Sequence, residues 1–169
     1  MLDRVDIEPV FFAPFVSSVM QVEPQWIDYN GHLNMAYYNV LFDRAVDELL
    51  ELVGAGKDYV QREQRSIFTA EAHLLYLREL QSGDPVRVTV QLLAYDAKRL
   101  HYFEQLFHAS HGWVSATSEN MSLHVDLTAR KTAAFPDKVA ERLAKMQAAH
   151  ANLPRPEAAG RRIAMPVKS

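Results

Sequence analysis

The side chains best able to do chemistry are concentrated in residues 26–34, Trp-Ile-Asp-Tyr-Asn-Gly-His-Leu-Asn. Asp28 stands three residues before Gly31 and six before Asn34, which is a good N-cap residue for a helix. A carboxylate can act as a general base or a nucleophile, and the free N–H groups and dipole of a helix N-terminus favour the oxyanion of acyl transfer. Asp, Asn and Gly are also the usual components of turns. The cluster therefore indicates either an acyl-transfer site at a helix start or a simple turn.

A long helix is predicted directly after this cluster, over residues 35–53. Its apolar residues are spaced 3, 4, 3, 4 and 3 apart and share one helical stripe: Met35, Tyr38, Phe42, Ala45, Leu49 and Leu52. Gly54 can supply the left-handed residue that commonly ends a helix. Such a helix would be about 28 Å long. Its length and apolar stripe predict a core element.

The remaining pattern is that of an antiparallel sheet. Alternating apolar residues predict strands near 17–22, 66–80, 85–95, 100–108 and 113–125, separated after the helix by short turns. Apolar residues at helical spacing predict a second helix from Asp137 to about His150. The fold class is therefore α+β, with a long central helix, a five-stranded antiparallel sheet around it and a C-terminal helix. We expect one domain over residues 1–152 and an extended, basic, proline-containing tail over 153–169.

Composition excludes several classes of protein. The chain has 169 residues, no cysteine and a net charge of −3, so disulfides, thiolate catalysis and cysteine-ligated metal sites are excluded and general attraction to nucleic acid is not expected. The sequence has neither an apolar run long enough for a membrane helix nor the pattern of a signal peptide, which favours a cytoplasmic protein without membrane association. Apolar residues on both faces of the predicted strand 66–80 favour a homodimer, which could pair further into a tetramer.

The motif Asp28-x-x-Gly31-His32-x-Asn34, followed by Tyr37-Tyr38, resembles the signature of the hotdog-fold acyl-CoA thioesterases of the 4-hydroxybenzoyl-CoA thioesterase type. The resemblance covers roughly residues 15–135, and the order strand, buried helix and antiparallel sheet is that of the hotdog fold. Further stretches are similar to the branch associated with carnitine breakdown, which cleaves betainyl-CoA: residues 71–73, 83–84, 98–101, 116–117 and 121–126.

The resemblance implies a small acyl-CoA substrate, with coenzyme A as part of the substrate and no further cofactor. Asp28 would be the catalytic carboxylate, either attacking the thioester carbonyl or activating water. His32 and Asn34 are candidate assistants, and the backbone at Gly31 and Met35 is the candidate oxyanion site. Trp26, Tyr37 and Glu71 are candidate substrate contacts, because a quaternary ammonium is bound by aromatic faces and some hotdog branches use a glutamate base. The candidate contacts to the phosphates of coenzyme A are Lys98, Arg99, Arg130 and Lys131.

Each candidate has a structural alternative. His32 could bond only within its own loop, Asn34 could be only a helix cap, Glu71 could face solvent, and the aromatic residues could be core. No metal site is expected, because His108 with His111, and His124 with Asp126, lack a third ligand.

Two other functions remain open at this stage. An enoyl-CoA hydratase of the same fold would need a different spacing of Asp and His, and an Asn-Pro that this loop lacks. A non-catalytic module that binds acyl-CoA would normally carry a DNA-binding segment, for which no pattern is found. Thioester hydrolysis fits the residues better than either alternative.

Overall fold

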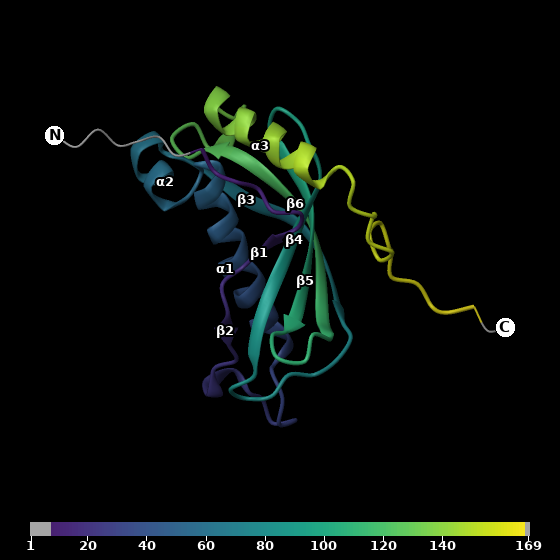
Figure 1. The fold of residues 1–169 in the computed structure, drawn as a ribbon. Helices are drawn as coiled ribbons and strands as arrows, with labels where there is room; N and C mark the ends of the chain where they lie inside the picture. Colours follow the sequence, from purple (N-terminus) through teal and green to yellow (C-terminus); the bar gives the residue numbers. More distant parts are fainter. Residues whose placement is uncertain (1–7, 168–169) are drawn as a thin grey trace.

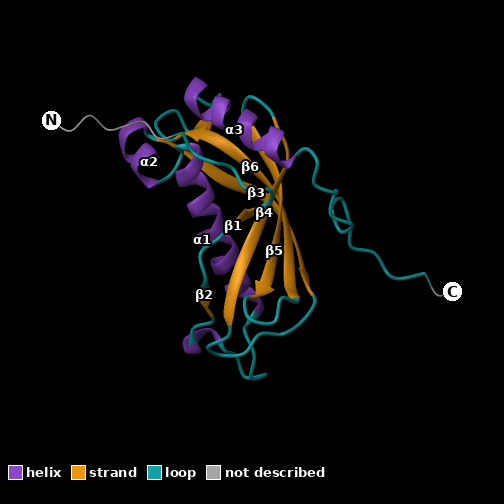
Figure 2. Cartoon of the chain, viewed as in Figure 1, coloured by secondary structure: helices purple, strands orange, loops and turns teal. Residues whose placement is uncertain are grey.

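A long helix lies across one face of a single antiparallel sheet in the computed structural model, which describes residues 8–167 (Figures 1 and 2). The elements in chain order are β1 (Phe15–Val16), β2 (Met20–Gln21), a 3₁₀ turn (Pro24–Trp26), α1 (Met35–Val53), α2 (Lys57–Glu63), β3 (Arg65–Tyr76), β4 (Pro85–Tyr95), β5 (Arg99–His108), β6 (Val114–Asp126), β7 (Lys131–Thr132) and α3 (Asp137–His150). The predicted α+β class and the predicted central helix are confirmed.

Helix α1 begins and ends where the sequence predicts. The Asn34 side chain accepts a hydrogen bond from the Ala36 N–H, and Gly54 adopts a left-handed conformation with φ of 79°. The buried residues of the helix form one stripe: Tyr38, Leu41, Phe42, Ala45, Leu49, Leu50 and Val53. Two residues expected on this stripe are not fully buried: Met35, the first residue of the helix, is 64% exposed, and Leu52 is half-buried.

The sheet has the order β1-β4-β5-β6-β3, with β2 also pairing with β4 and β7 with β6. The strand predicted over 17–22 is observed only in part: β2 lies within that range, a separate strand, β1, precedes it, and residues 17–19 separate the two. Ser17 explains the interruption, because its Oγ accepts the Val88 N–H in place of a backbone carbonyl. The sheet has seven strands instead of five because of this division and the two-residue β7.

Strand β3 differs most from its prediction. It ends at Tyr76, short of the expected Leu80, and its middle residues 68–72 are exposed where burial on both faces was expected. The reason is its place at the end of the sheet, where only β6 pairs with it. Its register with β6 shifts between Thr69 and Glu71, which leaves Ala70 without a partner. Helix α2, for which no prediction was made, connects α1 to this strand.

The sheet face that packs against α1 has an apolar half and a polar half. On β4 the buried residues of this face are Val86, Val88, Val90 and Leu92. On β6 the corresponding buried residues are Ala116, Ser118, Asn120, Ser122 and His124. Small polar side chains do not fill space as valine and leucine do, so the β6 half leaves room beneath the helix.

Helix α3 and the tail complete the molecule. Helix α3 packs on β4, and its bounds agree with the prediction. Residues 153–167 contain no helix or strand, although the Gly160 N–H donates to Glu119 Oε2 and the Gln91 side chain donates to the Pro154 carbonyl. No helix within residues 8–167 combines the length and apolarity needed to cross a membrane.

Candidate active site

The loop between the 3₁₀ turn and α1 is closed by its own backbone. The Asp28 N–H donates to the His32 carbonyl and the Gly31 N–H donates to the Asp28 carbonyl. Gly31 has a φ of +80°, which glycine adopts without strain. A bond from the Leu33 N–H to the Leu80 carbonyl, of 2.8 Å, ties the loop to the segment between β3 and β4. Asp28 is therefore held on a tight, anchored loop.

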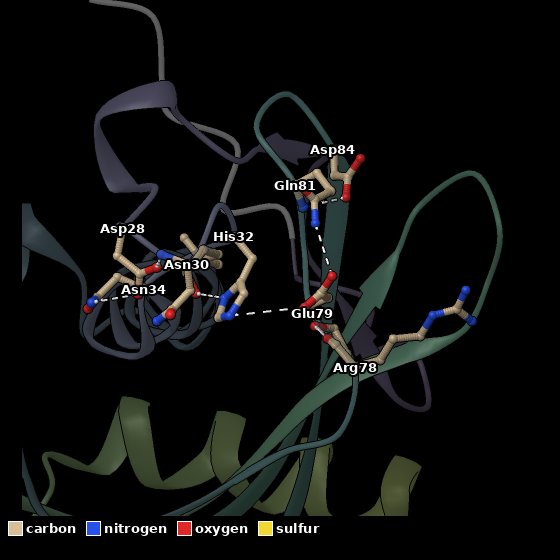
Figure 3. A network of polar contacts seen from close by, with 10 residues as sticks. Asp28, Asn30, His32, Asn34, Arg78, Glu79, Gln81 and Asp84 are labelled. Atoms are coloured by element: carbon tan, nitrogen blue, oxygen red, sulfur yellow. Dashed lines mark hydrogen bonds and ion pairs between the residues drawn. The ribbon is translucent and has the colours of Figure 1, made fainter.

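The Asp28 carboxylate is fixed beside the N-terminus of α1 (Figure 3). Its Oδ1 accepts the Asn30 N–H at 2.8 Å, and its Oδ2 accepts the Asn34 side-chain amide at 3.1 Å. The Asn34 Oδ1 in turn accepts the Ala36 N–H at 3.0 Å. One side chain, Asn34, thus caps the helix and orients the carboxylate, so the two roles considered for it occur together.

The first helical amide, that of Met35, is an available donor. The Ala36 N–H is bonded to the Asn34 side chain and the Tyr37 N–H to the Asn34 carbonyl. No hydrogen bond among residues 8–167 uses the Met35 N–H. The Met35 carbonyl accepts the Tyr76 hydroxyl at 3.2 Å, which connects this end of α1 to β3. A free N–H at the positive end of a helix dipole is suited to binding an oxyanion.

His32 lies between this loop and the segment that follows β3 (Figure 3). Its Nδ1 donates to the Leu33 carbonyl at 3.1 Å, and its Nε2 is 4.0 Å from Glu79 Oε2. Within the described part of the chain, no hydrogen bond joins His32 to the Asp28 carboxylate. A catalytic role for His32 therefore stays a prediction, and its observed contacts are local.

Trp26 and Tyr37, predicted substrate contacts, form one aromatic pair. Their rings stack with centroids 5.6 Å apart, and the Arg44 guanidinium is 5.1 Å from the Trp26 ring centre. Trp26 is buried, and its carbonyl accepts the Asn34 N–H. Trp26 is thus bonded to the end of the Asp28 loop. Contact of either ring with substrate stays a prediction.

A cavity of about 350 Å³ lies between α1 and the polar half of the sheet. Its lining comes from α1, β3, β5 and β6: Asn39, Val40, Phe42, Asp43, Val46, Thr69, Ala72, Tyr102, Glu104, Ser118 and Asn120. Small-molecule sites commonly have volumes of about 300–1,000 Å³. Asn39 is one helical turn after Met35, so the cavity begins close to the free amide.

One lining residue that the sequence did not single out is Glu104, which is 2% exposed. Its Oε2 accepts the Asn120 side-chain amide at 2.9 Å, while its Oε1 has no hydrogen-bond partner. Burial raises the pKa of Glu104 well above its usual range, and the nearby Asp43 carboxylate raises it further. The alternation of side chains along β5 could have indicated this residue, because Glu104 occupies the inward-facing position between Tyr102 and Leu106.

Glu71, another predicted substrate contact, is exposed and does not line the cavity. Ala72, its neighbour, lines the cavity instead. The alternation of side chains along β3 accounts for this arrangement, since adjacent residues point to opposite faces. The structure therefore does not bring Glu71 together with Asp28, and the exposed position considered as the alternative is the observed one.

The four predicted contacts to coenzyme A lie together, but far from Asp28. Lys98 and Arg99 line one surface pocket, Arg130 and Lys131 line another, and Thr132 belongs to both pockets. Arg99 is paired with Asp96, and this pairing and two backbone N–H groups lower the pKa of the Asp96 carboxyl to about 2. These residues follow the far end of β4, whereas the Asp28 loop adjoins its beginning (Figure 1). Eleven residues of strand span roughly 35 Å.

The histidines considered as metal ligands have other partners. His108 Nε2 is 3.7 Å from Asp84 Oδ1, and His124 bonds Tyr59 and the Ala133 carbonyl. Within residues 8–167, no group of three or more His, Asp or Glu side chains is arranged to hold a metal ion.

The sequence matches the profile of the Thioesterase-like superfamily over residues 22–143. It is 41% identical to the betainyl-CoA thioesterase of Pseudomonas aeruginosa over 145 residues, which are 86% of this chain and 91% of that protein. It is also 40% identical over 141 residues to the L-carnitine dehydrogenase/betainyl-CoA thioesterase of a Rhizobium species. That match covers 83% of this chain but only 28% of the longer protein.

Solved structures show the same architecture. A hypothetical protein of Staphylococcus aureus, solved in complex with CoA, superposes with a TM-score of 0.85 at 30% identity, covering 93% of this chain and 98% of that one. The 1,4-dihydroxy-2-naphthoyl-CoA thioesterase of Synechocystis superposes with a TM-score of 0.67 at 17% identity over 85% of this chain and 99% of that one. The latter similarity concerns the fold alone.

Proposed function

This chain belongs to the thioesterase-like superfamily and has the hotdog fold of its thioesterases, and on that premise we propose that it hydrolyses the thioester of betainyl-CoA. The observation that carries the proposal is the Asp28 carboxylate, held by Asn34 beside the free Met35 N–H at the start of α1. The P. aeruginosa relative supports the choice of acyl group, because its similarity to this chain extends over nearly its whole length.

The proposed reaction places the thioester carbonyl against the Met35 N–H. Asp28 either takes a proton from an attacking water or attacks the carbonyl carbon itself. In both routes the carbonyl oxygen becomes an oxyanion, which the Met35 N–H and the helix dipole stabilise. Collapse of the tetrahedral species breaks the C–S bond, and the thiolate takes up a proton to leave as the coenzyme A thiol. Where Asp28 attacks directly, the anhydride that it forms with the acyl group is then hydrolysed by water, which releases the acid and regenerates the carboxylate. Water supplies the atoms that complete the free acid and the thiol, so no other reactant is needed.

We further propose that the enzyme is a cytoplasmic homodimer, paired through the free edge of β3, that needs no cofactor. Antiparallel pairing of two β3 strands would place the Arg65 end of one strand beside the Tyr76 end of the other. The Tyr76 hydroxyl bonds the carbonyl of Met35, the first residue of α1. The two basic pairs, Lys98-Arg99 and Arg130-Lys131, lie toward the opposite end of β3, because Lys131 pairs with Asp126 of β6, which also pairs with Arg65. A partner would thus bring its own Lys98, Arg99, Arg130 and Lys131 toward the Asp28 loop, where the phosphates of coenzyme A would lie.

The substitution Asp28→Asn tests the catalytic assignment. We expect kcat for betainyl-CoA to fall at least about 100-fold, because the variant loses the base or nucleophile. Release of free coenzyme A thiol measures the rate. An asparagine cannot accept both the Asn30 N–H and the Asn34 amide as the carboxylate does, so a modest loss of stability is expected as well.

Thermal unfolding separates lost chemistry from lost structure in this variant. Glu141→Gln is the matched control, since Glu141 is an exposed carboxylate on α3, outside both the cavity and the β3 edge, and we expect its rate to stay near that of the wild type. Turnover by Asp28→Asn at the wild-type rate would remove Asp28 from the mechanism. Hydration of enoyl-CoA without thiol release from any acyl-CoA would reject thioester hydrolysis altogether.

A further inference from the structure

The cavity beneath α1 contains a buried carboxyl group that the fold leaves without a full set of partners. Glu104 lies in the inner register of β5, where its neighbours Tyr102 and Leu106 are core residues. Its Oε2 is bonded to Asn120, but its Oε1 is buried without a hydrogen bond. An unsatisfied buried polar atom is costly, and native structures contain few of them. A glutamate retained at such a position requires a reason beyond packing.

A second carboxylate borders the same cavity. Asp43 extends from α1 into the lining and is exposed to solvent. Its effect on Glu104 is repulsive, as expected for like charges with no cation between them. No lysine or arginine lines this cavity. The electrostatic environment therefore favours a positively charged guest and disfavours an anionic one.

Aromatic side chains supply the remaining recognition. Phe42 and Tyr102 both line the cavity, and the Tyr102 hydroxyl is bonded to Ser122 Oγ at 3.1 Å, which fixes its ring. Aromatic faces attract cations that cannot donate hydrogen bonds, and the attraction strengthens when the cation is desolvated. Two carboxyl groups and two rings around a small cavity thus match a compact quaternary ammonium group.

We propose that Glu104 and Asp43 select for an acyl group that carries a positive charge, by placing its cationic head in the cavity between α1, β5 and β6. The two carboxyl groups are specificity-determining residues and take no part in bond breaking. This inference rests on the proposed thioesterase function, since it assigns the acyl end of the same substrate. It also extends that function, because it attributes the preference for a charged acyl group to two named side chains.

A pair of isosteric substrates tests the proposal. Betainyl-CoA carries a trimethylammonium group, and 3,3-dimethylbutyryl-CoA carries a tert-butyl group of the same shape without the charge. We expect the wild-type enzyme to have the higher kcat/KM for betainyl-CoA. In Glu104→Gln we expect kcat/KM for betainyl-CoA to fall about 10- to 100-fold, because the cationic head then loses the buried carboxyl group that ionises when a cation is bound beside it. The value for the neutral substrate should stay the same or rise.

Asp43→Asn provides a second variant at an exposed position where folding is not at risk. We expect it to lower the same preference by a smaller factor, because solvent screens its charge. Asp47→Asn is the matched control, since Asp47 lies one turn further along α1 and does not line the cavity. It should leave the ratio of the two kcat/KM values unchanged.

The outcomes distinguish this inference from the proposed function. Thioester hydrolysis with no preference for the cationic substrate, or an equal loss for both substrates in Glu104→Gln, would overturn the assignment of the cavity while leaving a thioesterase. A preference in the wild type that persists in both variants would also overturn it. Failure of the wild type to release thiol from any acyl-CoA would overturn the proposed function itself.

Discussion

Asn34 shows how one residue can connect a helix cap to a catalytic group. Its side-chain oxygen accepts the Ala36 N–H, and its side-chain nitrogen donates to Asp28. The amide can do both because it carries an acceptor oxygen and a donor NH2 group, whereas a carboxylate cannot donate. The arrangement makes the geometry of the carboxylate depend on the start of the helix.

The variant Asn34→Asp separates the two roles. It keeps the oxygen that caps the helix but replaces the donor to Asp28 with a second carboxylate, so we expect thermal stability to change little and kcat to fall about 10-fold or more. Repulsion between the two carboxylates raises the pKa of the pair, and the acid limb of the pH–rate profile should therefore move to higher pH. Steady-state rates of thiol release between pH 4 and pH 8 provide the measurement.

In Asn34→Ala both roles are lost, and we expect a destabilisation of about 1 kcal/mol in addition to the lower rate. An Asn34→Asp variant as active as the wild type would show that the asparagine serves only as a cap.

At the level of elements, two buried histidines join separate parts of the fold in their neutral form. His150 on α3 accepts the Leu92 N–H through Nδ1 and donates to the Phe12 carbonyl through Nε2. His124 on β6 donates to the Ala133 carbonyl through Nδ1 and accepts the Tyr59 hydroxyl through Nε2. In both, one ring nitrogen must stay unprotonated to accept a bond. Burial lowers the pKa of both histidines.

We expect these two histidines to lower the free energy of unfolding as the solution is acidified through pH 6.5, while the raised pKa of Glu104 contributes in the opposite direction. The unfolded chain binds a proton at each histidine near pH 6.5, whereas the folded chain resists protonation until a lower pH. Stability from these two groups is therefore complete above pH 6.5 and is lost progressively below it, with a limit of about 1.4 kcal/mol per pH unit for each histidine. The free energy of unfolding in urea, measured from pH 7.5 to pH 5, tests this.

His150→Gln removes one titrating group. The slope of the free energy of unfolding against pH should therefore decrease by an amount that corresponds to at most one bound proton, about 1.4 kcal/mol per pH unit. We expect the variant to be less stable at pH 7.5, because the glutamine amide does not reproduce both hydrogen bonds of the imidazole, to the Leu92 N–H and to the Phe12 carbonyl. An unchanged slope would show that His150 does not account for the dependence.

For the whole molecule, the edge of β3 that does not pair with β6 is the feature that indicates a partner subunit. This strand of 12 residues pairs on one side only, and Phe68, Tyr76 and Leu77 near it are exposed. Long exposed edges of this kind are normally paired or protected. The separation of the basic pairs from Asp28 within one protomer is a second reason to expect a partner.

We expect sedimentation to give twice the mass of the 19.2 kDa chain, or a multiple of that dimer. Ala70→Pro should yield a monomer with low activity, because proline removes an edge N–H at the centre of β3. The register with β6 skips Ala70, so we expect the protomer itself to stay folded, which circular dichroism can check. Ser82→Pro, in the exposed turn of residues 81–84 before β4, is a control for proline away from this edge, because proline is favoured at the second position of such a turn. A fully active wild-type monomer would contradict the dimeric site.

Local patterns in the sequence were sufficient for α1, α3 and the strands β4, β5 and β6, and for the hydrogen bonds to the Asp28 carboxylate. The bounds of α1 follow from the Asn34 cap, the apolar stripe and Gly54, all of which act within a few residues along the chain. The same holds for α3 and for the alternation in β4. The hydrogen bonds that hold the Asp28 carboxylate are equally local, since they join residues at most six positions apart.

Features that depend on which strands meet were decided only by the tertiary structure. Glu104, Asn120 and Asp43 come from β5, β6 and α1, and their common cavity exists only after the helix has packed on the sheet. The bulge at Ala70 and the exposure of Glu71 depend on pairing with β6. The distance of the basic pairs from Asp28 depends on the length of β4. Short-range propensities determine where an element begins and ends, but contacts between distant residues arise only from the packing of whole elements, which no local pattern encodes.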